Sequence, residues 1–264
     1  MITAPNIGRA VAAALRLNGS GRVVAVFSLA IYIECSGELF ALVPITQASG
    51  PLHARVSVLP LTQTGASVAI KESQLFIEGD HIWLSKDIWE PPSVADLDSA
   101  VKFLGEIFMH EPLVGLQESS PGSLEMVLKP FLLRNDLPGA CALIFGRGIG
   151  LTPAGDDVCA GLLIAHHLRG SLDEAEHVKM AIEAPTHEIS RAFLKWAAKG
   201  EGIEPLFLLL SACSNRTADL TQRYLKVLAS IGHTSGLDLL YGLLIGLKYT
   251  QQTNRVAGSI RYFQ

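Results

Sequence analysis

The stretch Gly146–Ile164, GRGIGLTPAGDDVCAGLLI, decides how the rest of the chain is interpreted. Three glycines alternate with larger residues in its first part, at Gly146, Gly148 and Gly150. Glycine adopts positive φ angles without a steric penalty and lets a ligand approach the backbone closely. The apolar, small residues that follow at 154–168 are typical of a buried helix. The stretch therefore predicts a glycine loop that leads into a buried helix.

The start of this helix has the features of an anion site. Thr152 suits the N-cap and Pro153 suits the first helical position. A helix N-terminus after a glycine loop presents free N–H groups and a partial positive charge. Asp156 and Asp157 in the first turn have two interpretations: they complement the helix dipole, or they hold a metal such as Mg²⁺ or Mn²⁺ or orient a substrate. A nucleotide P-loop is excluded, because these acids stand where Lys and Ser/Thr are required.

A second copy of the pattern follows in GHTSGLDLLYGLLIG, which starts at Gly232. With Gly155 placed on Gly236 and no gap, six of ten positions coincide, among them an aspartate and a second glycine. The matching residues of the second copy are Gly236, Asp238, Gly242, Leu243, Leu244 and Ile245. Either two apolar helices agree by composition, or they form a structural pair whose N-termini face one pocket.

Composition limits the class of protein. The chain has 264 residues, is 49% hydrophobic and carries a net charge of −4, so we expect a large core and no nucleic-acid partner. The cysteines form no CxxC pair, which predicts reduced core thiols in a cytoplasmic protein. They are Cys35, Cys141, Cys159 and Cys213. No apolar run reaches the length of a membrane-spanning helix, so no membrane association is expected.

The sequence pattern changes near residue 92, from one typical of strands to one typical of helices. Residues 5–17 predict an amphipathic helix, and the branched, aromatic run 23–33 predicts a strand. Further short strands are expected at 39–45, 52–60, 66–70, 74–78 and 81–85. They predict an antiparallel sheet or small barrel.

Almost everything after residue 92 predicts helices. We expect them at 93–110, 123–133, 153–168, 171–183, 186–199, 203–212, 215–230 and 236–248, with Ser93 and Thr186 as caps of their helices and a tail or final strand at 250–264. The class is therefore α+β, with a β-rich domain at 1–92 and a helical domain at 93–264. Within the helical part, Thr186 and Ser190 lie four residues apart on one side of a helix, next to Arg191.

Three segments together resemble a known family. They are GIGLTPAGDD, THEIS and GHTSGLDLLYGLL, in this order. The family carries the label of carboxylases of unknown function and includes the small subunit of the anaerobic oxamate carbamoyltransferase of allantoin degradation (AllH-like). The resemblance covers about residues 20–250, because VFSLAIYIECSGELFALVPITQASGP is similar to the β-rich segment of the family. Ala154 departs from the family pattern, where serine is usual, so a role for that hydroxyl is not expected here.

This resemblance implies a transferase subunit of purine and allantoin catabolism that works with other protein subunits. Its reaction interconverts oxamate and carbamoyl phosphate with oxalurate and phosphate, which are small anions. Carbamoyl transfer requires positioning and charge stabilisation and no redox cofactor. As catalytic candidates we take Arg147 as a phosphate or carboxylate clamp, Asp156 and Asp157 as metal ligands or holders of the carbamoyl NH₂, and His233 as a donor. The substrate-binding candidates are Gly148, Gly150, Thr152, Gly155, Thr186, Ser190, Thr234, Ser235 and Gly236.

Three hypotheses stay open at this point. The chain is a subunit of a carbamoyltransferase-like enzyme, with its anion site at 146–157. Alternatively, it is a stand-alone metal-dependent enzyme that acts on small carboxylates, with a divalent cation on Asp156 and Asp157. In the third hypothesis it is a non-catalytic assembly subunit, whose glycines, among them Gly161 and Gly242, serve close packing against another chain.

Overall fold

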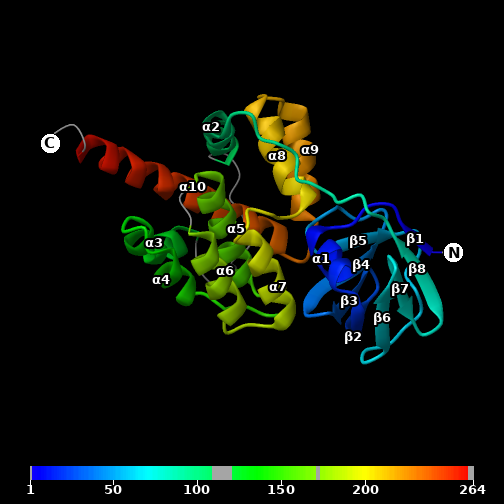
Figure 1. Cartoon of the computed structure of the whole chain (residues 1–264). Coiled ribbons are helices and arrows are strands. Elements are labelled where there is room, and N and C mark those ends of the chain that lie inside the picture. Colours follow the sequence, from blue (N-terminus) through cyan, green and yellow to red (C-terminus); the bar gives the residue numbers. More distant parts are fainter. Residues whose placement is uncertain (1, 109–120, 171–172, 261–264) are drawn as a thin grey trace. The chain divides into compact units, whose positions relative to one another are not determined.

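A computed structural model describes residues 2–108, 121–170 and 173–260 of the chain. It forms two compact units, Met1–Pro91 and Pro92–Gln264. The first unit is built on a β-sheet and the second is helical, so the predicted α+β class is confirmed (Figure 1). That the units fold as separate domains, at 1–92 and 93–264, stays a prediction.

The first unit is an eight-stranded sheet with the order β1-β8-β7-β6-β2-β3-β4-β5. Its elements are β1 (Ile2–Ala4), α1 (Arg9–Leu17), β2 (Gly19–Phe27), β3 (Ala30–Cys35), β4 (Glu38–Pro44), β5 (His53–Val56), β6 (Ser67–Lys71), β7 (Gln74–Ile77) and β8 (Asp80–Leu84). Among the strand pairs that the structure describes, the outer pairs β1–β8 and β4–β5 are parallel and the others are antiparallel. Ile7 bridges to Ala54 of the far edge strand β5 and to Ile88, so the sheet nearly closes on itself.

The strand at 23–33 was predicted as one element and is two. Phe27 pairs with Ala30 across a tight turn at Ser28 and Leu29. No glycine, proline, asparagine or aspartate signals this turn, so the hydrophobic run conceals it. The short edge strand β1 was also not predicted. The alternation within β3 is typical of a half-buried strand, with Ile31, Ile33 and Cys35 buried.

The second unit consists of α2 (Leu97–Phe108), α3 (Pro121–Leu132), α4 (Leu137–Ala142), α5 (Ala154–Leu168), α6 (Glu174–Glu183), α7 (Glu188–Ala197), α8 (Glu204–Ser214), α9 (Ala218–Ala229) and α10 (Ser235–Ile260). Helix α5 is its centre, because every residue of 155–166 except Asp157 is buried. It packs mainly against α10, and also against α7 and α4. The predicted buried helix at 154–168 is therefore confirmed.

Two helices differ from the sequence prediction. Helix α4 lies between the predicted helices 123–133 and 153–168, where no helix was expected; Asp136 caps it by accepting a hydrogen bond from the N–H of Gly139 at 2.8 Å, and Pro138 sits in its first turn. The expected tail or strand at 250–264 is wrong as far as residue 260, because α10 continues to Ile260. Its polar residues beyond Thr250 lack the apolar period that marks a packed helix. Residues 261–264 lie outside the described residues.

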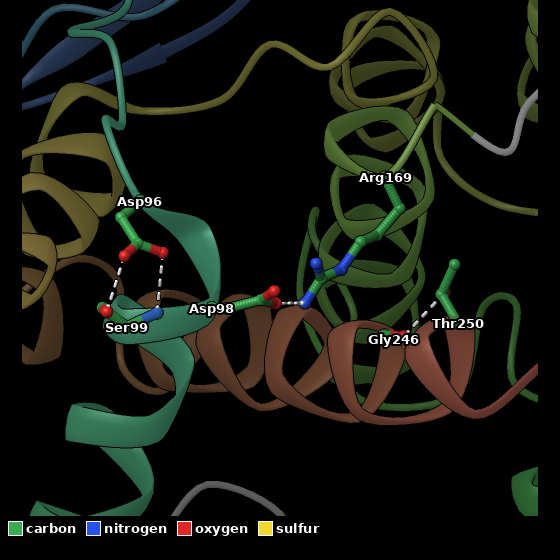
Figure 2. Close-up of polar contacts among 6 residues, drawn as sticks. All are labelled: Asp96, Asp98, Ser99, Arg169, Gly246 and Thr250. Atoms are coloured by element: carbon green, nitrogen blue, oxygen red, sulfur yellow. Dashed lines mark hydrogen bonds and ion pairs between the residues drawn. The ribbon is translucent and has the colours of Figure 1, made fainter. Parts of the chain in front are cut away.

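Polar contacts fix the ends of α2 and α5 (Figure 2). Asp96, not the predicted Ser93, caps α2: its carboxylate accepts hydrogen bonds from the N–H of Ser99 at 3.0 Å and from its hydroxyl at 2.7 Å. Arg169, directly after α5, reaches the carboxylate of Asp98 at 2.7 Å. These contacts tie the C-terminal end of the central helix to the first turn of α2.

The prediction of core thiols is confirmed, and a cytoplasmic location stays a prediction. All four cysteines are free and buried. Burial raises the pKa of the Cys159 thiol in α5 well above its usual value, so this thiol stays neutral and packs as a small apolar group.

Candidate functional site

The glycine loop is exposed and adopts the backbone that its sequence predicts. Gly146, Gly148 and Gly150 have φ angles of +68°, +125° and +93°, in the region that side chains disfavour. The loop folds back on the start of α5, since the N–H of Gly155 donates to the carbonyl of Arg147 at 2.8 Å. Gly155 is also sterically required, because a Cβ there would lie 1.9 Å from the carbonyl oxygen of Ile144.

Asp156 fastens this loop to the start of α7. Its side chain is buried, with 1% of the residue exposed. The carboxylate accepts three hydrogen bonds: from the N–H of Gly146 at 2.8 Å, from the hydroxyl of Ser190 at 2.7 Å and from the hydroxyl of Thr186. A carboxylate with three donors is well satisfied inside a protein. Asp156, Thr186 and Ser190 are therefore occupied with one another.

Two predicted caps do not form, because each threonine hydroxyl has a partner elsewhere in the chain. Thr152 is not the N-cap of α5; Pro153 takes that position and the Thr152 hydroxyl lies 3.2 Å from the hydroxyl of Ser235 instead. The N-cap of α7 is His187, whose ring nitrogen accepts from the N–H of Ile189, and not Thr186. Both threonine hydroxyls have partners far away in the sequence, which local pattern rules do not register.

The two repeated segments form a structural pair. A Cβ on Gly161 of α5 would lie 2.1 Å from the carbonyl oxygen of Leu239, and a Cβ on Gly242 of α10 would lie 2.0 Å from that of Val158. These contacts are reciprocal, because the repeat that places Gly161 on Gly242 also places Val158 on Leu239. The backbones of α5 and α10 thus touch at two equivalent glycines. This closeness is the structural reason for the repeated glycines.

The hydroxyls of Thr152 and Ser235 lie within hydrogen-bonding distance, so the N-terminal ends of these two helices are adjacent. Each end carries one aspartate of the repeat, Asp157 in α5 and Asp238 in α10. Both are only half satisfied: Asp157 has a hydrogen bond with Ser235, and Asp238 has one with Thr234. Within the described residues, the Oδ2 atom of each is buried and makes no hydrogen bond.

The environment favours the neutral form of both carboxyls. Burial raises the pKa of Asp157 well above its usual value; its hydrogen bond with Ser235 opposes the shift, while the charges of Asp238 and Asp156 add to it. Burial also raises the pKa of Asp238, against the hydrogen bond with Thr234. Asp156 and Asp157 are neighbours in sequence, yet the first is fully bonded within the protein and the second is not. A carboxyl with a raised pKa and an unpaired oxygen is a candidate functional group.

The structure places the other predicted site residues in three groups. Thr152, Thr234, Ser235 and Gly236 lie with Asp157 at the joined ends of α5 and α10. Arg147, Gly148 and Gly150 lie in the exposed loop, and the side chain of Arg147 is exposed. His233 is exposed in the turn before α10. Asp238 was missing from the predicted site, although the repeat aligned it with Asp157.

The geometry gives little support for a metal ion. Among residues 2–108, 121–170 and 173–260, no group of three or more His, Cys, Asp or Glu side chains is arranged to hold one. Asp156, one of the two predicted ligands, already accepts three hydrogen bonds.

In the same residues, no helix is long and apolar enough to cross a membrane.

Comparison with known proteins finds one family match, which lies within the helical unit. Residues 144–247 match the family model described as oxamate carbamoyltransferase subunit AllH. No solved structure matches the chain. The matched segment begins just before the glycine loop and contains Asp156, Asp157, Ser190 and Asp238, so it holds the whole site described above. The resemblance expected from the three motifs is thereby confirmed over residues 144–247, which are similar to the family of the oxamate carbamoyltransferase subunit AllH, while its extension to the β-rich segment stays a prediction.

Proposed function

We propose that the chain is a subunit of an oxamate carbamoyltransferase-type enzyme and binds a small anionic substrate at the glycine loop and the joined N-termini of α5 and α10. The observation that carries this proposal is the match of residues 144–247 to the AllH family. A subunit acts together with other chains, so partner proteins are part of the proposal. Its substrates would be carbamoyl phosphate and oxamate, or phosphate and oxalurate in the opposite direction.

The glycine loop supplies the donors that a phosphate or carboxylate needs. Within the described residues, the backbone N–H groups of 148–152 make no hydrogen bond to the rest of the chain. Successive N–H groups with glycines at positive φ form concave anion sites. The guanidinium of Arg147 is exposed in the same loop and can contact phosphate or carboxylate with two parallel hydrogen bonds. These groups would stabilise the charge on the departing phosphate as the carbamoyl group is transferred, without a redox cofactor.

The other two hypotheses find less support. Asp156 is occupied by three donors, which weakens the case for a divalent cation on Asp156 and Asp157. Gly161 and Gly242 each face the backbone of the partner helix within the chain, so they are not free for close packing against another protein. The anion site at the loop is the function that the geometry supports best.

Replacing Arg147 with glutamine tests this anion site. We expect carbamoyl phosphate and inorganic phosphate to raise the melting temperature of the wild-type chain, since a ligand at 100 times its Kd stabilises by about 2.7 kcal/mol. Arg147→Gln should weaken both affinities by about tenfold or more, because one charge-assisted contact is lost. Titration with each anion measures the change.

A matched control is Arg223→Gln, which removes the same charge from an exposed position in α9. It should leave both affinities unchanged. Equal affinities of Arg147→Gln and the wild type would show that the loop is not the anion site.

A further inference from the structure

Asp157 and Asp238 form a pair that the anion site does not explain. They occupy equivalent positions in the two repeats and lie at the adjoining N-termini of α5 and α10. Their charges interact across the helix pair. A negatively charged substrate gains nothing from two more carboxylates, and each of these has a buried oxygen without a partner in the described residues. An unsatisfied buried oxygen costs stability and therefore calls for a functional explanation.

Two such carboxyls cannot both be ionised at low cost. Both are desolvated, and Asp238 is 1% exposed. Like charges at a shared site push one proton onto the pair, as in other carboxyl dyads. Among the described residues, Asp156 also carries a charge that acts on Asp157, and this charge further disfavours ionisation of Asp157. The proton is best placed on Asp157, whose pKa the charge of Asp238 raises.

We propose that Asp157 and Asp238 share one proton and bind a primary amide or carbamoyl group, with the protonated carboxyl donating to its carbonyl oxygen and the ionised one accepting from its NH₂ group. This inference rests on the proposed function and names the part of the substrate that the pair recognises. A primary amide presents one acceptor oxygen and an NH₂ donor on the same carbon, which complements one O–H donor and one carboxylate. A carboxylate in its place would offer no donor to Asp238.

The pair is connected to the surface through partly exposed side chains. Asp157, Ser235 and Thr152 each keep some exposure, whereas Asp238 is buried. Asp157 is linked to Ser235, whose hydroxyl lies 3.2 Å from that of Thr152. Asp157 is therefore the member of the pair that keeps contact with solvent, and Asp238 is the buried one.

Oxamate and oxalate provide the test, because they have nearly the same size and differ by an NH₂ group in place of a carboxylate oxygen. Titration calorimetry at pH 7 with the full-length chain should show oxamate binding at least tenfold tighter than oxalate, a ratio that corresponds to about 1.4 kcal/mol. The double variant Asp157→Asn/Asp238→Asn should reverse this preference. It has no charge at the pair and offers side-chain NH₂ donors to both carboxylates of oxalate.

The two single variants serve as controls for folding, and they test whether one proton on the pair is sufficient for the preference. Asp157→Asn and Asp238→Asn both leave one carboxylate and one neutral amide, which is the hydrogen-bonding pattern of the singly protonated pair. Both should therefore keep the preference for oxamate. Asp219→Asn, in the exposed first turn of α9, removes a charge elsewhere and should change nothing.

Equal affinities of the wild type for the two compounds, no binding of either, or an unchanged preference in the double variant would overturn the amide-binding pair. This outcome is separate from the proposed function. Carbamoyl transfer by the assembled enzyme, together with a lost or absent preference, would refute the pair alone. An intact oxamate preference in a chain that supports no carbamoyl transfer would refute the proposed function alone.

Discussion

Gly161→Ala should unfold the helical unit or destabilise it by about 4 kcal/mol, among the largest effects of a single substitution. The new methyl group would lie 2.1 Å from the carbonyl oxygen of Leu239 and 2.4 Å from the backbone nitrogen of Leu243. Both are backbone atoms of α10, so no side-chain rotation relieves the overlap and the two helices must move apart. Urea unfolding followed by circular dichroism measures the loss.

The control is Gly105→Ala in α2, where an added Cβ meets nothing within 4 Å. It should stabilise by about 0.5 to 1 kcal/mol, because alanine loses less conformational freedom in a helix than glycine. Gly242→Ala should behave like Gly161→Ala, given its reciprocal contact with Val158. If Gly161→Ala unfolds at the same urea concentration as the wild type, α5 and α10 are not packed backbone to backbone.

The adjacent residues Asp156 and Asp157 should respond oppositely to the same substitution. Asp156→Asn should destabilise by about 3 to 5 kcal/mol, because it breaks a buried, charged hydrogen-bond network. Asp157→Asn should raise the free energy of unfolding by on the order of 1 kcal/mol at pH 7, because it removes a buried carboxyl that is costly to ionise. Equilibrium unfolding of both variants at pH 7 and pH 4 measures this contrast.

The pH dependence follows from the direction of the Asp157 shift. A carboxyl whose pKa is raised by folding binds its proton more tightly in the folded state. The stability that this provides is complete below the unfolded pKa and is lost as pH rises through the folded pKa. The gain from Asp157→Asn should therefore be present at pH 7 and shrink at pH 4. A destabilised Asp157→Asn at pH 7 would mean that this carboxylate, like Asp156, is satisfied within the protein.

Local sequence patterns were sufficient for the elements that depend on local chemistry. The glycine loop, the buried helix after it and the repeat at Gly236 follow from glycine spacing and apolar runs. The hairpin turn at Ser28 and Leu29 was missed because it lacks glycine, proline, asparagine and aspartate, and the far end of α10 was missed because it lacks an apolar period. The capping residues of α4 were present in the sequence, but no helix was predicted there.

The site was predictable only in outline. Asp156 and Asp157 are indistinguishable in sequence, but successive helix residues point about 100° apart, so one meets Thr186 and Ser190 and the other meets α10. Which hydrogen-bond donors lie next to each carboxylate depends on packing between segments far apart in the chain. Thr152 and Thr186 were wrongly predicted as caps because the distant partners of their hydroxyls, Ser235 and Asp156, cannot be recognised from local sequence. Asp238 becomes part of the site only because the glycine contacts bring α10 against α5.

The most direct measurement is the release of phosphate from carbamoyl phosphate, dependent on oxamate, by the chain assembled with the subunits that purify with it. We expect activity that disappears when the chain is omitted and falls by at least about a hundredfold with Asp157→Asn/Asp238→Asn, a loss typical of removing groups that position a substrate. Asp219→Asn should retain full activity. An assembly that transfers the carbamoyl group equally well without the chain, or with the double variant, would contradict the account.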